Sequence, residues 1–189
     1  MDCGRRFRLA DMSELRECRE KWEARFSQKF SDLWVPGHQD GFDRLIVVPG
    51  GMRAHVIYER LIKSAILRGH RHNVDNLKTL SSDRLTPYPH AVWVRDRQEA
   101  DGCHDGKSYF DLLAECISGI AFEEWLVLAE DWWIEHCSCL DAQGSTLCTG
   151  SRFTDGNVPI GSRGDEWRDM PCYGLRSGVD GRRVREVVA

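Results

Sequence analysis

The last forty residues constrain the fold of this chain more than any other segment. From Thr149 onward the sequence is dense in glycine and arginine, and it has almost no aliphatic residues until its final stretch, 184–188. A segment of this composition cannot bury enough apolar surface to form a core of its own. We therefore expect a Gly/Arg-rich tail, residues 149–181, that is held at both ends by the rest of the chain and exposes most of its side chains.

The composition of the whole chain fits such a supporting core. Its 189 residues are 41% hydrophobic and 30% charged, which suits one domain with a small appendage. A net charge of −4 gives no general attraction to nucleic acid, so we do not expect a nucleic-acid partner. No apolar run reaches the roughly 18–20 residues of a membrane helix, and the first residues lack the apolar stretch of a signal peptide. The expected location is the cytoplasm, or a phage particle.

Apolar residues at three- and four-residue spacing predict an amphipathic helix near the N-terminus. Asp11 can cap this helix, and its apolar stripe comprises Leu15, Cys18, Trp22, Phe26, Phe30 and Leu33. The stripe would pack on the domain or on a partner chain, so residues 12–34 are also a candidate surface for a homo-oligomer. Turn residues follow at 35–41. We therefore divide the chain into a helix and linker, 1–40, and an α+β domain, 41–189.

The rest of the chain predicts an α+β fold, with a helical N-terminal half that contains short strands and a loop-rich β region at the C-terminus. The segment 121–135 is the most apolar of the predicted helices and should lie at the centre of the core. The other predicted elements are helices at 53–68 and 108–116 and strands at 45–48, 91–94, 146–148 and 184–188.

Clustered cysteine and histidine residues give one candidate metal site. Without a secretory signal the eight cysteines are expected to be reduced thiols. His136, Cys137 and Cys139 are the best zinc ligands by residue type, with Cys103 and His104 as a second half. The chain lacks a Cys-x-x-Cys pair, however, so unligated cysteines are the simpler interpretation, and zinc is the alternative.

Two groups of charged residues are candidates for a chemical role. Asp96, Glu99 and Asp101 could act as paired carboxylates, although a charged turn after a strand explains them more simply. Strand alternation places Arg183 and Arg185 on one outer face, where they would form salt bridges or touch phosphate. No catalytic motif is present in the sequence, so we expect no enzymatic activity.

Several segments resemble an uncharacterised group of proteins from metagenomic bacteria, phages and candidate-phylum genomes. The resemblance covers about residues 85–189, and its matching pieces are 91–101, 119–124, 140–141, 146–152, 155–156, 158–159 and 183–188. This chain departs from the group at Arg163 and Cys172, where tryptophan is usual, and at Arg182, where leucine is usual. Each change removes an apolar side chain.

The tail of that group is similar to the variable C-type-lectin-like region of proteins diversified by retroelements. The resemblance implies a rigid scaffold whose exposed side chains are interchangeable, here Phe153, Thr154, Asn157, Ile160, Ser162 and Tyr173. We add Trp167 and Arg176 as contact residues because aromatic and arginine side chains dominate interfaces. The leading hypothesis is a non-enzymatic binding protein for a protein or glycan ligand. The alternatives are a small zinc protein without other cofactors, and a regulatory or DNA-binding protein of mobile elements.

Overall fold

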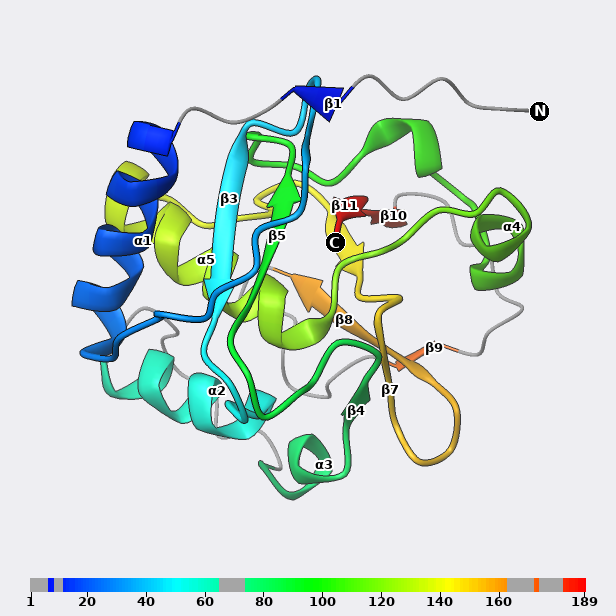
Figure 1. Ribbon diagram of the computed structural model, residues 1–189. Helices are drawn as coiled ribbons and strands as arrows, with labels where there is room; N and C mark the ends of the chain where they lie inside the picture. Colours follow the sequence, from blue (N-terminus) through cyan, green and yellow to red (C-terminus); the bar gives the residue numbers. More distant parts are fainter. Residues whose placement is uncertain (1–6, 9–11, 65–73, 163–171, 174–181) are drawn as a thin grey trace.

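The computed structural model describes residues 7–8, 12–64, 74–162, 172–173 and 182–189. Figure 1 shows helices packed against several small, mostly antiparallel sheets, which confirms the α+β fold class. The helices are α1 (Met12–Phe26), α2 (Ala54–Lys63), α3 (Val74–Lys78), α4 (Tyr109–Ala114) and α5 (Phe122–His136), with a 3-10 turn η1 (Gly102–His104). None of the helices in the described part of the chain is long and apolar enough to cross a membrane.

The strands of these sheets are all short. They are β1 (Phe7–Arg8), β2 (His38–Gln39), β3 (Arg44–Val48), β4 (Ser81–Ser82), β5 (His90–Val94), β6 (Ser145–Leu147), β7 (Ser151–Arg152), β8 (Val158–Ser162), β9 (Cys172–Tyr173), β10 (Arg182–Val184) and β11 (Val187–Val188).

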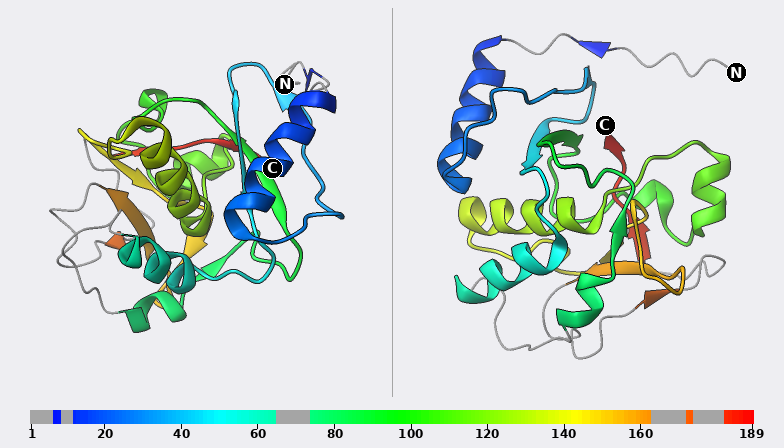
Figure 2. Two further views of the ribbon diagram at one scale, coloured as in Figure 1. Left: turned by 90° about the vertical axis from the view of Figure 1, so that its left-hand side faces the viewer. Right: turned by 60° about the horizontal axis from the view of Figure 1, so that its bottom comes forward.

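Helix α5 is the central element of the core, as its apolar sequence predicts. Its side chains are buried from Phe122 to Trp132, and it packs against β3, β8 and α2. In Figure 2 α2 runs alongside α5. The buried side chains include the carboxylates of Glu123, Glu124, Glu130 and Asp131, so the elements that cover α5 supply hydrogen-bond partners as well as apolar contacts.

Three strands from distant parts of the chain form one sheet in the order β11-β5-β3. Strands β3 and β5 pair antiparallel with Ile46 opposite Val92, which confirms the two strands expected from their apolar runs. The C-terminal strand β11 adds to the other edge of β5, with Val188 opposite Trp93. The end of the chain is thereby held in the main core.

A second sheet holds the C-terminal region in the order β10-β6-β8-β9. Strand β10 is parallel to β6, whereas β8 is antiparallel to both β6 and β9. All five residues of β8 are buried, which corrects the expectation that this part of the tail is exposed. One face of β8 meets Trp125 of α5 at Gly161, and the other face adds Val158 and Ile160 to a small cluster with Leu112, Leu147 and Val184.

Helix α1 packs on the domain through its apolar stripe. Trp22 and Phe30 are fully buried in the main core, and Leu15 and Cys18 pack against it. The helix is shorter than the predicted one because the backbone turns at Ser27, which has a positive φ of 51°. Phe30 therefore reaches the core from the loop after the helix. Self-association through residues 12–34 stays a prediction.

Candidate functional site

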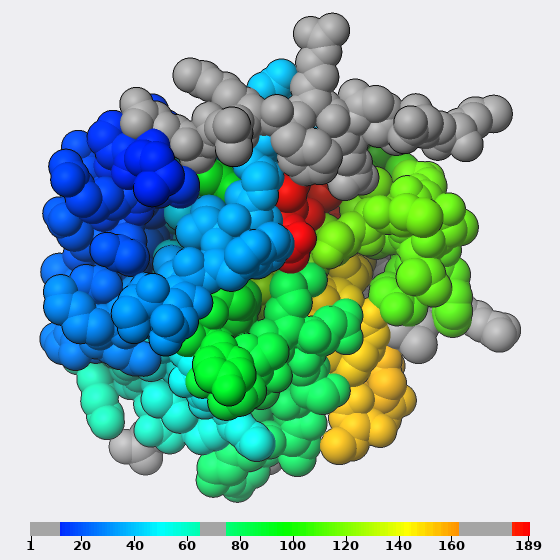
Figure 3. Space-filling view, viewed as in Figure 1, coloured from blue at the N-terminus to red at the C-terminus, as the bar shows by residue number. Residues whose placement is uncertain are grey.

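Three of the predicted ligand-binding residues, Phe153, Thr154 and Asn157, lie in the loop that joins β7 to β8. Thr154 is exposed, whereas Phe153 and Asn157 are half-buried. In Figure 3 this loop, coloured orange, lies on the surface at the lower right. It projects from the sheet at a point where side chains can reach solvent.

Hydrogen bonds close this loop into a tight turn. The Phe153 amide donates to the Asn157 carbonyl at 2.9 Å, and the Gly156 amide donates to the Phe153 carbonyl at 2.9 Å. Asp155 accepts from the Asn157 amide at 2.9 Å. Gly156 has a φ of +83°, a conformation that glycine adopts without strain. The loop is therefore ordered by its own backbone.

The other predicted ligand-binding residues are less accessible or fall outside the described residues. Ile160 is 2% exposed and Ser162 is 8% exposed, so the expectation that they face a ligand is wrong. Ile160 is buried because it belongs to the small cluster with Leu112 and Val184, and Ser162 ends the same buried strand. Tyr173 lies on β9 opposite Val158, and its side chain is not described. Trp167 and Arg176 lie outside the described residues.

The predicted zinc ligands at the end of α5 do not form a ligand cluster. The His136 ring lies against Trp132, with ring centroids 4.1 Å apart, and Cys137 ends the helix with a φ of +50°. In the described ranges, the one group of three potential ligands close enough to share a cation is Asp101, His104 and Glu186.

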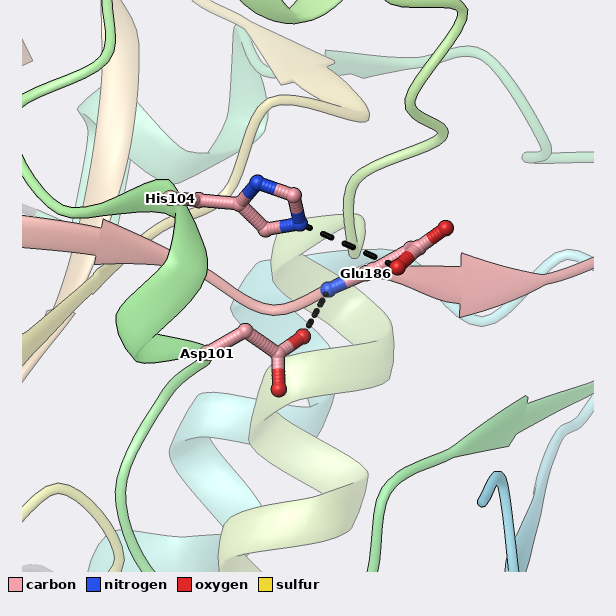
Figure 4. Close-up of side chains that lie close together, drawn as sticks. All are labelled: Asp101, His104 and Glu186. Atoms are coloured by element: carbon pink, nitrogen blue, oxygen red, sulfur yellow. Dashed lines mark hydrogen bonds and ion pairs between the residues drawn. The ribbon is translucent and has the colours of Figure 1, made fainter. Parts of the chain in front are cut away.

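This Asp101–His104–Glu186 cluster joins two parts of the chain that are far apart in sequence. Asp101 directly precedes η1 and His104 is its last residue, while Glu186 lies between β10 and β11. The Glu186 amide donates to Asp101 Oδ2 at 2.7 Å, and the Asp101 amide donates to the Val184 carbonyl at 3.1 Å. Figure 4 shows the His104 ring facing the Glu186 carboxylate. All three residues are buried, with exposed fractions of 0%, 5% and 7%.

Arg95 bridges the two carboxylates of this cluster. It donates to Asp101 Oδ2 at 2.7 Å and to Glu186 Oε2 at 2.8 Å. Burial opposes the charge on Arg95, but the hydrogen bond to Glu186 and the charge of Asp101 outweigh it and raise the pKa of Arg95. His104 Nε2 lies 3.7 Å from Glu186 Oε2, too far for a hydrogen bond. The charged turn expected at 95–101 is therefore partly a buried network.

Arg185 corrects the predicted placement of the C-terminal arginines. Its side chain is fully buried, pairs with Asp141 at 3.0 Å and donates to the carbonyls of Arg97 and Gln98. Arg185 lies after the end of β10, outside the strand to which the alternation applies, and its side chain faces the interior. Arg183 stays half-buried, 3.5 Å from Asp105. Neither arginine is positioned as an open phosphate contact.

Asp141 accepts two further hydrogen bonds beneath the second sheet. Trp125 Nε1 donates to it at 2.8 Å and Thr146 Oγ1 at 2.7 Å. Burial raises the pKa of Asp141 despite the opposite charge of Arg185. Sequence reasoning missed both Asp141 and Glu186. The sequence does contain one signal that could have indicated Glu186, which is a carboxylate between the valines of segment 184–188.

Comparison of the chain with protein-family models, with curated proteins and with solved structures gave no match. The class of the protein therefore follows from its own geometry. It is an α+β protein in which a small C-terminal sheet packs on the central helix through Gly161 and Trp125, and in which Arg185, directly after β10, pairs with the buried Asp141.

Proposed function

We propose that this is a non-enzymatic binding protein whose recognition surface lies in the C-terminal region after Arg152. One observation carries the proposal. Strands β8 and β10 flank β6 in a single sheet, which holds the chain at Ser162 and again at Arg182, and β9, between them in sequence, pairs with the other edge of β8. The residues between these two points can therefore vary without moving the ends that hold them.

The sheet suits this role because it is fixed on every side by contacts that do not involve the loops. Gly161 meets Trp125, Val184 is fully buried, and Arg185 pairs with Asp141 beneath it. Loops on a rigid frame are the usual place for recognition, since a loop substitution leaves the core intact. This separation of a fixed sheet from its loops also favours a surface whose amino-acid sequence changes rapidly.

The start of the recognition surface is also held in place. The Arg152 guanidinium lies 4.0 Å from the centroid of the Tyr109 ring, and it donates to the Thr149 carbonyl at 2.6 Å. A cation over an aromatic ring and a charge-assisted hydrogen bond together restrict the loop that follows. Phe153 and Asn157 thus belong to a preorganised turn, which lowers the entropy cost of binding.

The ligand class in this proposal is a protein or a surface glycan. Phe153, Thr154 and Asn157 are the proposed contacts among the described residues, and Tyr173, Trp167 and Arg176 remain proposed contacts from sequence. A C-type-lectin-like arrangement and diversification by a retroelement are further parts of the proposal, supported by the resemblance alone. A location in the cytoplasm or a phage particle is also proposed. Burial of Arg185 and pairing of Arg183 argue against DNA binding through these arginines.

A glycan microarray probed with the purified protein tests the proposal. The wild type should bind a subset of glycans, and Phe153→Ala combined with Asn157→Ala should weaken that binding about tenfold or more, as expected for contact residues. Ile134→Ala is the matched control, because Ile134 is an exposed apolar side chain on α5 outside the loop. Equal glycan binding by the loop variant and the wild type would contradict the assignment of these contacts.

A further inference from the structure

The geometry points to a binding site for one zinc ion formed by Asp101, His104 and Glu186. Each residue offers one ligand atom, and the three atoms lie within 4.8 Å of one another in a buried position. One imidazole nitrogen with two carboxylate oxygens is a ligand set that zinc accepts, with a fourth position left for water. The site is separate from the recognition loop, so its test does not depend on the proposed function.

Three buried polar atoms of this cluster have no hydrogen-bond partner among the described residues. They are both ring nitrogens of His104 and Oδ1 of Asp101. Buried polar atoms are nearly always paired in folded proteins, because an unpaired one forfeits its hydration without compensation. A bound cation accounts for His104 Nε2, since this nitrogen of the neutral ring has a free lone pair for coordination.

Arg95 supports the ligands from behind. Arg95 and the Glu186 amide both donate hydrogen bonds to Asp101 Oδ2, so Oδ1 has no hydrogen bond. Arg95 also donates to Glu186 Oε2. Carboxylates that bind metals are commonly oriented by such outer hydrogen bonds. The two carboxylates carry more negative charge than Arg95 neutralises, and Arg97 is half-exposed at 3.6 Å from Asp101. Because Arg97 lies beyond hydrogen-bond distance and is half-exposed, it neutralises Asp101 only in part, which favours a bound cation.

The separation of the three ligand atoms indicates that the site must contract when it binds the ion. Zinc bonds to nitrogen and oxygen are about 2.0–2.2 Å, so ligand atoms up to 4.8 Å apart must move closer together on binding. Calcium prefers six to eight oxygen ligands and does not suit an imidazole beside an arginine. Zinc would link η1 to the segment between β10 and β11. The ion would thereby restrain β10, which is an edge strand of the C-terminal sheet.

Calorimetric titration of metal-free full-length protein with zinc, and with calcium as the contrasting ion, tests this site. The wild type should bind one equivalent of zinc and no calcium, and His104→Ala should weaken zinc binding at least about 100-fold, as loss of a ligand exceeds loss of an outer partner. The matched control combines His136→Ala, Cys137→Ser and Cys139→Ser, which removes the site predicted from sequence and should leave zinc affinity unchanged.

Cobalt substitution in the wild type keeps the test decisive if the His104 variant does not fold. Cobalt bound by nitrogen and oxygen should show visible d–d absorption without a thiolate charge-transfer band, and Glu186→Gln should weaken its binding as well. Absence of stoichiometric zinc binding by the wild type, wild-type affinity in His104→Ala, or a thiolate band would each overturn the proposal.

Discussion

Gly161 lies directly against the indole of Trp125, so closely that a Cβ at position 161 would come within 2.1 Å of a ring carbon. This contact joins the C-terminal sheet to the central helix α5. It requires a residue without a side chain on the inner face of β8, and it explains how a strand with few large apolar residues is buried along its whole length.

Gly161→Ala should therefore destabilise the protein by about 1–3 kcal/mol, because the added methyl group forces the indole or the strand to move. Urea unfolding followed by tryptophan fluorescence measures this difference. Gly102→Ala is the control, since a Cβ there meets nothing within 4 Å, and its effect should stay within about 0.5 kcal/mol. Equal stabilities of the two variants would mean that β8 is not packed against Trp125.

Arg185→Leu should be far more damaging than Arg183→Ala. Removal of Arg185 leaves the carboxylate of Asp141 buried without its counter-charge, which costs about 3–5 kcal/mol. Arg183 is half-buried, and its pair with Asp105 at 3.5 Å is of the kind that contributes about 0–1 kcal/mol. Thermal unfolding of the two variants side by side checks the ranking, and the reverse order would place Arg185 at the surface.

Stability should fall at acid pH through Glu124. Burial opposes ionisation of this carboxyl, but Arg84, which donates to it at 2.6 and 2.8 Å, lowers its pKa from 4.5 to about 2. A lowered native pKa contributes stability that is present above pH 4.5 and is lost as the pH falls toward 2, by roughly 3 kcal/mol in total. The free energy of unfolding of wild type and Glu124→Gln between these pH values measures it. A pH dependence that is the same in both proteins would exclude Glu124 as its source.

Asp131→Ala should loosen α1 from the domain. Asp131 is fully buried on α5 and pairs with Arg25, with Lys21 at 2.9 Å and with Arg44 at 2.7 Å. Its loss removes the carboxylate that Arg25 pairs with and leaves Lys21 and Arg44 with the more exposed Glu135, which should cost about 3 kcal/mol. Hydrogen exchange measured on the variant and the wild type should show that the substitution speeds amide exchange in α1 more than in β3. Glu135→Ala, at a partly exposed carboxylate that pairs with two of the same cations, should have a smaller effect.

The sequence predicts the elements whose burial depends on local pattern. Segment 121–135 is the most apolar of the predicted helices, and the runs at 45–48 and 91–94 are continuously apolar, so α5, β3 and β5 follow from the sequence pattern. The burial of β8 does not, because it comes from Gly161 meeting a tryptophan 36 positions earlier in the chain. Glu186 joins Asp101 and His104 through pairing of distant segments, which no local spacing reveals.

The DNA around the gene offers the most direct test that the C-terminal region is a diversified recognition surface. We predict a near-copy of the 3′ end of the gene beside a reverse-transcriptase gene, with differences mainly at adenines in the codons for residues 153–157 and 163–181. Codons for α5 and β11 should carry no such differences, because these elements hold the frame. A neighbourhood without a near-copy, or a copy whose differences fall on the codons for α5, would contradict the account.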